Sequence, residues 1–216
     1  MKTVLGDFLN GWEETGNRIM GSSFKNVNEL LRCKKHKLIE AKYLLSLPKN
    51  HSFLDIGANY GDTVLTLALH ASKNNRKDIK FFTFEPNKLK CKVIEEVSKK
   101  NNLKIKIFNN CVGNLEGFGI TDKIVEDIYG SCSFKFSKKN GIKILKIDNI
   151  YDLIKPIGIM HVDTEGWEIE VLKGCHNILN NKNNSFLLIC EYWDDDIAKN
   201  EKLRGRTNNI IYFTPK

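Results

Sequence analysis

The middle of the chain alternates between short apolar runs and amphipathic stretches of about 12 residues. The runs predict strands at residues 52–57, 79–86 and 103–113, and the stretches between them predict helices at 62–72 and 89–101. Strands that alternate with helices of this length form parallel βαβ units with right-handed crossovers. The pattern therefore predicts an α/β fold with a central, mostly parallel twisted sheet flanked by helices.

The pattern changes on both sides of this region. Apolar positions at roughly helical spacing, ending before Pro48, predict an N-terminal helical segment at residues 1–49 that packs on the core outside the sheet. Residues 116–148 hold short alternating runs that fit either a structural insertion or the wall of a substrate site. The sheet pattern then resumes with strand 157–166, helix 167–179, strand 185–193 and strand 208–215. We therefore divide the chain into residues 1–49 and a ligand-binding domain at residues 50–216.

Composition is that of a soluble globular protein, with 41% hydrophobic and 28% charged residues. No run approaches the roughly 20 consecutive apolar residues of a transmembrane helix, and the N-terminus carries Asp7, Glu13 and Glu14 in place of an apolar signal core. The six cysteines are scattered, which indicates reduced thiols and neither a zinc site nor disulfides. We expect a cytoplasmic protein that does not insert into membranes.

The net charge of +8 raises the question of a nucleic-acid partner. Of the 34 basic residues, 29 are lysines, and only five are the arginines that form bidentate contacts with phosphate and guanine. This composition is typical of a solvated surface, so we predict no nucleic-acid partner. Attraction to acidic sugars or nucleotide-linked donors stays open.

The stretch FLDIGANYG, residues 53–61, predicts a strand and a tight turn at the carboxyl edge of the sheet, where open α/β sheets bind ligands. Gly57 and Gly61 let a ligand approach the backbone, and the amides from Gly61 to Thr63 that open the next helix suit a carboxylate or phosphate. The glycine spacing differs from the dinucleotide fingerprint, and no Gly-Lys-Ser/Thr ending marks a P-loop. Asp55 can accept from an ammonium group or set the turn.

Glu85 follows the second predicted strand, 24 residues after Gly61. A carboxylate at that strand end can accept hydrogen bonds from both hydroxyls of a ribose. The turn and Glu85 together describe a ligand with a ribose and, close by, an amino-acid-like head. S-adenosyl-L-methionine (SAM) fits this description.

Six segments of the chain resemble FkbM-type SAM-dependent methyltransferases, a class I Rossmann-like group, in composition and order. They are FLDIGANYGDTVLTLA, FTFEPN, CVGNLEG, GSCSF, LKIDNIYDLI and HVDTEGWEIEVLKG. The resemblance covers roughly residues 50–192, and D-x-E-G-x-E-x-E-x-L-K-G is its most specific motif. The chain departs from the family at His161, where lysine is usual.

The resemblance implies a class I methyltransferase fold, SAM as cofactor and S-adenosyl-L-homocysteine as product. It also implies O-methylation of a sugar hydroxyl, in a glycan or glycoconjugate and on a deoxyhexose such as rhamnose. We expect the cofactor to be held by ten residues at the ends of the first three strands. They are Asp55, Gly57, Ala58, Asn59, Gly61, Asp62, Glu85, Pro86, Asn87 and Cys111.

A second group of polar residues lies on the strand predicted at 157–166 and at the end of the next strand. His161 and Asp163 are two positions apart, so they share one face of that strand. Methylation of a hydroxyl needs a base, for which Asp163 is the first candidate because of its place at the strand end and His161 the second because of its ordinary pKa. Each also has a structural interpretation, His161 as a buried hydrogen-bonded imidazole and Asp163 as an acid that orients the cofactor or a loop. Glu191, at the end of the next predicted strand, can bind a substrate hydroxyl or act as the base.

Four further residues are candidates for substrate binding: Glu165, Trp167, Tyr192 and Trp193. Glu165 is better explained as a helix cap, and the aromatic residues fit either sugar stacking or the core. Glu168 and Glu170 are predicted on a solvated helix face. A divalent metal between Asp163 and Glu191, joined by Asp194–Asp196, is possible but not favoured.

Two other functions stay open on these residues. One is a methyltransferase for RNA or protein, although the arginine clusters of an RNA-binding surface are missing from the sequence. The other is a SAM-binding module without catalysis that accompanies a glycosyltransferase, covalently or not. The sequence does not decide the acceptor among these.

Overall fold

The computed structural model describes residues 35–121, 134–164, 166–192 and 209–213. Within these ranges, the main sheet has six strands in the spatial order β3-β2-β1-β8-β9-β10. The strands from β3 to β9 are parallel, and β10 is antiparallel to β9. Their bounds are β1 Ser52–Ile56, β2 Lys80–Phe84, β3 Ile105–Phe108, β8 Ile157–Val162, β9 Leu187–Tyr192 and β10 Asn209–Phe213.

This strand order is that of a doubly wound, Rossmann-like sheet. The chain moves outward from β1 to β3 and then returns to place β8 on the other side of β1. The order therefore reverses between β1 and β8, and ligands of such sheets bind outside the carboxyl ends of the strands at this switch point. The predicted α/β fold with a mostly parallel sheet is confirmed.

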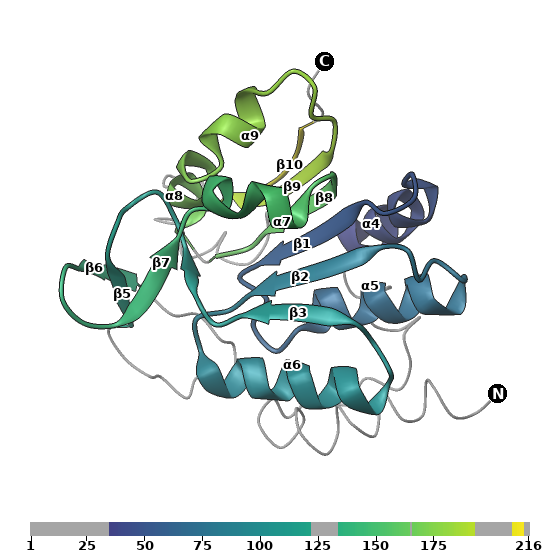
Figure 1. Cartoon of the computed structure of the whole chain (residues 1–216), viewed down its shortest axis with the longest axis horizontal. Coiled ribbons are helices and arrows are strands. Elements are labelled where there is room, and N and C mark those ends of the chain that lie inside the picture. The colour runs from purple at the N-terminus through teal and green to yellow at the C-terminus, as the bar shows by residue number, and fades with distance from the viewer. Residues whose placement is uncertain (1–34, 122–133, 165, 193–208, 214–216) are drawn as a thin grey trace, which may run out of the picture.

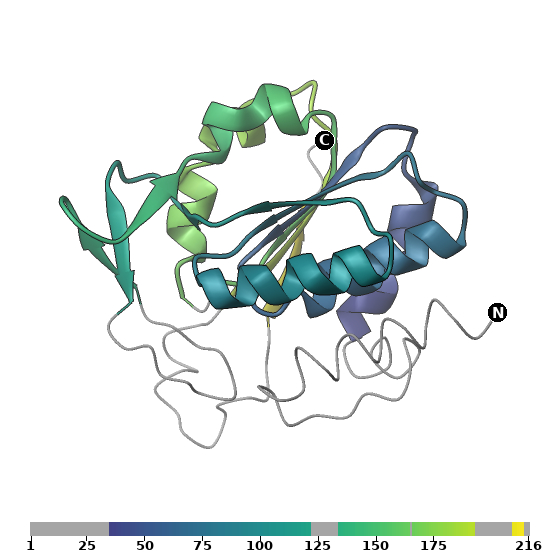
Figure 2. The same cartoon turned by 60° about the horizontal axis from the view of Figure 1, so that its bottom comes forward.

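Helices cover both faces of the sheet, as Figures 1 and 2 show. One face carries α4 Lys35–Ser46, α5 Asp62–Lys73 and α6 Lys88–Lys100. The other carries the short helices η2 Ile147–Ile150, α7 Tyr151–Ile154, α8 Glu168–Lys173 and α9 His176–Asn180. Only α4 represents the predicted N-terminal helical segment, because residues 1–34 lie outside the described part of the chain. The boundary at residue 50 stays a prediction.

Buried side chains alternate between the two faces along each strand, as the period of a strand requires. The cluster beneath α4, α5 and α6 includes Phe53, Phe81, Ile159, Leu187 and Ile189. The cluster on the opposite face includes Leu54, Phe82, Phe84, Met160 and Leu188. Asp55 and His161 are paired across β1 and β8 and share the parity of Phe53 and Ile159. Two polar side chains are therefore placed in the layer between the sheet and the first group of helices.

A second, smaller sheet of four strands projects from one end of the main sheet in Figure 1. Its order is β4-β7-β5-β6, with bounds β4 Cys111–Val112, β5 Phe118–Thr121, β6 Phe134–Ser137 and β7 Ile142–Leu145. Most of it corresponds to the alternating runs predicted within residues 116–148. The strand predicted at 103–113 is divided, because the chain leaves the main sheet after Phe108 and joins the small sheet at Cys111.

The helix predicted at residues 167–179 is also divided, into α8 and α9. Gly174 ends α8, and a Cβ at this position would lie 2.7 Å from the carbonyl oxygen of Gly113. The chain thus turns where it packs against the segment after β4. Among the described residues, no helix has the length and apolar character needed to cross a membrane.

Candidate functional site

Gly57 lies where the end of β1 meets the end of β8. Its φ is +86°, in the left-handed region, and its amide donates to the carbonyl of Phe84 at 3.0 Å. A Cβ on Gly57 would lie 1.9 Å from the carbonyl oxygen of Asp163. The glycine therefore lets two backbone segments meet at the switch point, which is the close approach that glycine permits.

Gly61 has a different role from the one expected. Its φ is +83°, and a Cβ would lie 2.8 Å from a side-chain carbon of Ile94 in α6. Its amide donates to the carbonyl of Ala58 at 2.7 Å, inside the turn. Gly61 thus sets the turn and lets α5 pack against α6. The amide of Gly61 was predicted to suit a carboxylate or phosphate, but here it is hydrogen-bonded to the backbone of Ala58.

Asp55 is fully buried at β1 and contacts two elements. Its Oδ2 accepts from the amide of Val64 at 3.2 Å, and its Oδ1 lies 2.8 Å from Nδ1 of His161. The N-cap residue of α5 is Gly61, which has no side chain to accept a hydrogen bond from the first turn of the helix. The carboxylate of Asp55, on the preceding strand β1, accepts one of these hydrogen bonds instead. Of the two roles expected of Asp55, the contacts favour setting the turn.

Glu85 lies at the end of β2 and is 5% exposed. Its Oε2 accepts from the amide of Asn59 and its Oε1 from the amide of Asn87, each at 2.8 Å. Residues 57–61, which connect β1 to α5, are called the glycine turn below. The carboxylate therefore joins the glycine turn to the turn after β2. Because a carboxylate has about four lone-pair sites, it can accept further hydrogen bonds from a ligand.

Burial sets the charge state of this carboxyl. Desolvation raises the pKa of Glu85 to about 7, opposed by the hydrogen bond from the amide of Asn87, by the nearby ammonium of Lys90 and by the hydrogen bond from the amide of Asn59. Glu85 therefore titrates near neutral pH. Perturbed carboxyls of this kind are frequent at functional sites.

The other residues expected to hold the cofactor surround the same two turns. Asn87 caps α6, since its side chain accepts from the amides of Leu89 at 2.9 Å and Lys90 at 3.3 Å. Cys111 is buried near Glu85, and desolvation together with that carboxylate raises the pKa of its thiol to about 12. Ala58 is buried, whereas Asp62 and Pro86 are half-buried.

His161 faces inward, beneath α4. Its Nδ1 lies 2.8 Å from Asp55 and its Nε2 lies 3.9 Å from Oε1 of Glu40, and the side chain is 7% exposed. Burial lowers the pKa of His161, but Glu40, Asp55 and Asp163 outweigh it and raise the pKa to about 9. An imidazole that is already protonated and paired on both sides is poorly placed to accept a substrate proton. Of the alternatives stated above, the buried hydrogen-bonded imidazole is the one with support.

Asp163 follows β8 directly, and its amide donates to the carbonyl of Ile56 at 3.0 Å. Asp163 is half-buried, and its Oδ1 is buried without a hydrogen-bond partner among the described residues. The amide oxygen Oδ1 of Asn59, on the neighbouring turn, is also buried without a hydrogen-bond partner among the described residues. Buried polar atoms without partners are uncommon in proteins, and each calls for an explanation such as a ligand or water.

The loop after Asp163 is held by Glu168, which was predicted to lie on a solvated helix face. Glu168 is 4% exposed, and its Oε1 accepts from the amide of Thr164 at 2.9 Å, its hydroxyl at 3.0 Å, and the amide of Gly166 at 3.1 Å. The prediction of a solvated face is therefore wrong for Glu168. It does not hold in full for Glu170 either, which is half-buried and pairs with the exposed Lys173 at 2.6 Å.

The substrate-binding candidates are only partly described. Glu165 and Trp193 lie outside the described residues, as do the side chains of Glu191 and Tyr192. The backbone of Glu191 lies one position beyond the Val162–Cys190 pair, and Asp163 directly follows the other residue of that pair. Trp167 is half-buried and packs against the core, with its indole nitrogen 3.0 Å from where a Cβ on Gly113 would lie.

The metal alternative depends on residues that are only partly described. Among the residues with described side chains, no group of three or more His, Cys, Asp or Glu is placed to hold a metal ion. Of the proposed ligands, Asp194–Asp196 and the carboxylate of Glu191 lie outside that set.

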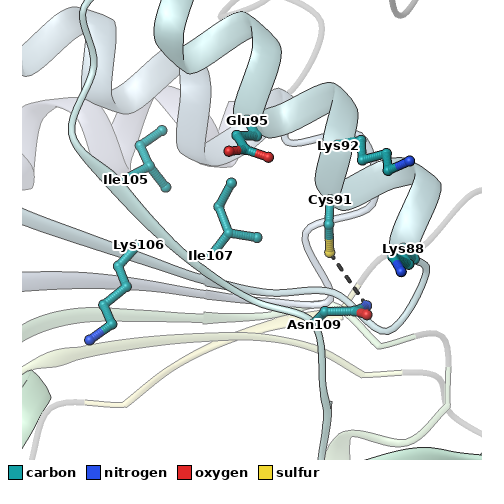
Figure 3. Close-up of a pocket in the computed structure, with 8 residues that line it drawn as sticks. All are labelled: Lys88, Cys91, Lys92, Glu95, Ile105, Lys106, Ile107 and Asn109. Carbon is teal, nitrogen blue, oxygen red and sulfur yellow. Dashed lines mark hydrogen bonds between the residues drawn. The ribbon is translucent and has the colours of Figure 1, made fainter.

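A groove of about 530 Å³ lies between α6 and the edge strand β3 (Figure 3). Its floor includes Ile105 and Ile107, and the amide of Asn109 lies 3.6 Å from the thiol of Cys91. Lysines 88, 92 and 106 stand around it. Lysines are ordinary on an edge strand and its surroundings, where they oppose pairing with other chains.

No family model matches this chain. Over 117 residues the chain is 32% identical to ribosomal RNA small subunit methyltransferase G of Mycoplasma mobile. This alignment covers 51% of this chain and 49% of that protein. The chain therefore spans about half the length of this curated relative.

Solved structures give more distant similarities. A methyltransferase FkbM from Methylobacillus flagellatus aligns with 85% of this chain and 47% of its own, at 13% identity and a TM-score of 0.43. A precorrin-6y C5,15-methyltransferase from Geobacter metallireducens aligns with 78% of this chain and 68% of its own, at 12% identity and a TM-score of 0.43.

Proposed function

We propose that this protein is a SAM-dependent methyltransferase that acts on a hydroxyl group. The observation that carries the proposal is the pairing of two polar features at one switch point. On the β1 side, the glycine turn and the buried carboxylate of Glu85 are joined through the amide of Asn59 at 2.8 Å. On the β8 side, Asp163 follows the strand with a buried oxygen that has no hydrogen-bond partner among the described residues.

The described residues fit the parts of SAM. Glu85 can accept from ribose hydroxyls with its remaining lone pairs. The unpartnered Oδ1 of Asn59 is an acceptor suited to the ammonium group of the amino-acid part of SAM. When bound, SAM supplies an electrophilic methyl group on its sulfonium. The other expected cofactor residues shape the two turns and need not contact the cofactor through their side chains.

The acceptor is proposed from the same edge of the sheet. A neutral hydroxyl is a poor nucleophile, so a base that takes its proton contributes about 10²- to 10⁴-fold. Asp163 is the proposed base, with Glu191 one strand away as the residue that binds or deprotonates the acceptor. The resemblance to FkbM-type enzymes favours a sugar hydroxyl in a glycan or glycoconjugate, and a deoxyhexose among sugars.

A ribosomal RNA acceptor is the second candidate. It is favoured by the similarity to an rRNA methyltransferase over half of this chain, which runs against our expectation of no nucleic-acid partner. The lysine-rich surface supplies positive potential for either an acidic glycan or RNA. A ring nitrogen of a base with a free lone pair has no proton to lose when it is methylated, so an RNA acceptor of that kind would leave Asp163 without a role as a base.

The test combines cofactor binding with methyl transfer. Calorimetry with SAM and with S-adenosylhomocysteine should show binding, and absence of heat and of a thermal shift would end the cofactor assignment. Radiolabelled SAM is then incubated with sugars, oligosaccharides and deproteinised or assembled small ribosomal subunits. Transfer to a sugar that is abolished in Asp163→Asn supports the proposal, whereas transfer to RNA that survives in this variant replaces it with the second candidate.

A further inference from the structure

A row of buried charged groups connects α4 to the glycine turn. Glu40 of α4 is 0% exposed, and its Oε1 lies 3.9 Å from Nε2 of His161. The other ring nitrogen, Nδ1, lies 2.8 Å from Oδ1 of Asp55, and Oδ2 of Asp55 accepts from the amide of Val64 in α5. The row therefore runs from α4 through β8 and β1 to the first turn of α5.

The middle of this row holds a side chain that can carry a positive charge between carboxylates. Buried carboxylates are costly unless they are paired, and here Glu40, Asp55 and Asp163 all act on one imidazole. These three groups come from α4, β1 and the end of β8, and the neighbouring strand β2 contributes only the neutral Thr83 beside Asp55. Burial lowers the pKa of His161, but the carboxylates raise it to about 9, so the ring carries a proton at neutral pH. A doubly protonated ring donates from Nδ1 to Asp55 at 2.8 Å and carries a positive charge 3.9 Å from Glu40.

The first turn of α5 depends on this arrangement. The amide of Val64 donates to Oδ2 of Asp55, and Nδ1 of His161 contacts Oδ1 of the same carboxylate. The glycine turn lies between Asp55 and Val64 in the chain, and the hydrogen bond from the Val64 amide to the Asp55 carboxylate joins its two ends. A separate helix, α4, therefore contacts the cofactor-binding segment through two side chains.

We propose that His161 is a positioning residue, an imidazolium that fixes α4 and the glycine turn in one arrangement and so makes cofactor affinity depend on Glu40. This rests on the proposed function for its cofactor part only. Neither Glu40 nor His161 is assigned a contact with SAM. The consequence is a coupling between α4 and the turn that a purely local packing role of either residue would not produce.

The experiment compares four variants by amide hydrogen exchange and by calorimetry with SAM. His161→Gln keeps a polar side chain but removes the charge, His161→Lys keeps a cation, and Glu40→Gln removes the α4 partner. His70→Gln is the matched control, because His70 is half-buried near the other end of α5. We expect His161→Gln to weaken SAM binding at least tenfold and to speed exchange of the Val64 amide, Glu40→Gln to do the same to a smaller degree, and His161→Lys to stay within about threefold of the wild type.

The pH dependence adds a readout that simple destabilisation does not move. The imidazolium is lost as pH rises through about 9, so wild-type exchange at Val64 should approach that of His161→Gln above this pH. His161→Lys should keep slow exchange to a higher pH. Should His161→Gln fail to fold, the Glu40→Gln variant and the wild-type pH series still test the coupling.

Two outcomes separate this inference from the proposed function. If the wild type binds no SAM, the proposed function fails, while exchange at Val64 in Glu40→Gln still decides whether α4 and the turn are coupled. If SAM binds and Glu40→Gln changes neither Val64 exchange nor affinity, the positioning role is overturned. Affinity unchanged in a folded His161→Gln variant overturns it as well.

Discussion

Glu85 allows a prediction whose sign changes with pH. Its carboxylate is 5% exposed and accepts two backbone hydrogen bonds at 2.8 Å, while burial raises its pKa from its ordinary value of 4.5 to about 7. A carboxyl whose pKa is raised in the folded state contributes stability that is present below about pH 4.5 and is lost as pH rises through about 7. Moving one pKa from 4.5 to about 7 corresponds to roughly 3 kcal/mol.

The perturbation is Glu85→Gln, which keeps the size of the side chain and removes the titration. Glutamine has one carbonyl acceptor for two backbone amides, so one of the amides of Asn59 and Asn87 loses its partner, at a cost of about 1–3 kcal/mol at every pH. The variant should therefore be less stable than the wild type at pH 5. Between pH 5 and pH 8.5 the wild type should lose roughly 3 kcal/mol relative to the variant, which brings the two close together or reverses their order.

The assay is urea unfolding of both proteins at half-unit steps from pH 5 to 8.5, with Glu96→Gln on the exposed face of α6 as a control for loss of one negative charge. The quantity of interest is the difference between the two free energies of unfolding, because other titrations cancel in it. A difference that stays constant across this range would show that Glu85 titrates as an ordinary carboxyl and would refute the reasoning. In parallel, SAM affinity of the wild type should fall as pH drops below about 7, because a protonated Glu85 is a poorer acceptor for ribose hydroxyls.

Three further predictions concern the switch point and its loop. Gly57→Ala should cost about 2–5 kcal/mol of stability, since an alanine there would have a left-handed backbone and would also clash with the Asp163 carbonyl. Gly166 has φ +99° and no atom of the described residues within 4 Å of its Cβ position, so Gly166→Ala should cost about 1–2 kcal/mol in thermal unfolding. Equal costs would show that β1 and β8 separate easily. Asp163→Asn should slow methyl transfer about 10²- to 10⁴-fold with SAM affinity within a few fold in calorimetry, and loss of binding with a residual rate at saturation would contradict the role of base. Glu168→Ala should cost about 2 kcal/mol or more through three lost hydrogen bonds, against about 0–1 kcal/mol for Glu170→Ala in its surface pair, as measured by urea unfolding. Indistinguishable values would remove Glu168 as the residue that holds the loop.

The fold could be predicted from the sequence because it depends on periodicity. Residues 52–57 and 79–86 are apolar on both faces, and such runs between amphipathic stretches belong to buried parallel strands. The breaks within predicted elements could not be read in this way. The division of 103–113 depends on where the chain leaves the main sheet, and the end of α8 depends on contact between Gly174 and the distant Gly113. Both are tertiary effects that no local pattern contains.

That several residues of the candidate site lie near one another could be predicted from the sequence, but only some of their contacts could. Asp55, Gly57, Glu85 and Asp163 were singled out because residues at the ends of parallel strands gather at one edge, and the structure does gather them. Which acid holds the loop was missed, because Glu165 and Glu168 both follow Asp163 and the choice depends on the path of that loop. Direct contacts of these residues with a cofactor stay a prediction.

Glu40 shows where a signal was present and unused. It lies beside Ala41 and four positions before Leu44 on the buried side of α4, and an ionised side chain in such a place needs a partner. His161 is the matching observation in the sequence, since a histidine in the buried run IGIMHV also needs partners on the same face of the sheet. Two buried charges of opposite sign, more than a hundred residues apart, are more economically explained by each other than by two separate roles. The same argument limits His161 as a base, because a protonated ring beside two buried carboxylates cannot take a further proton. Under the proposed function, Asp163 and Glu191 are then the remaining candidates for the base.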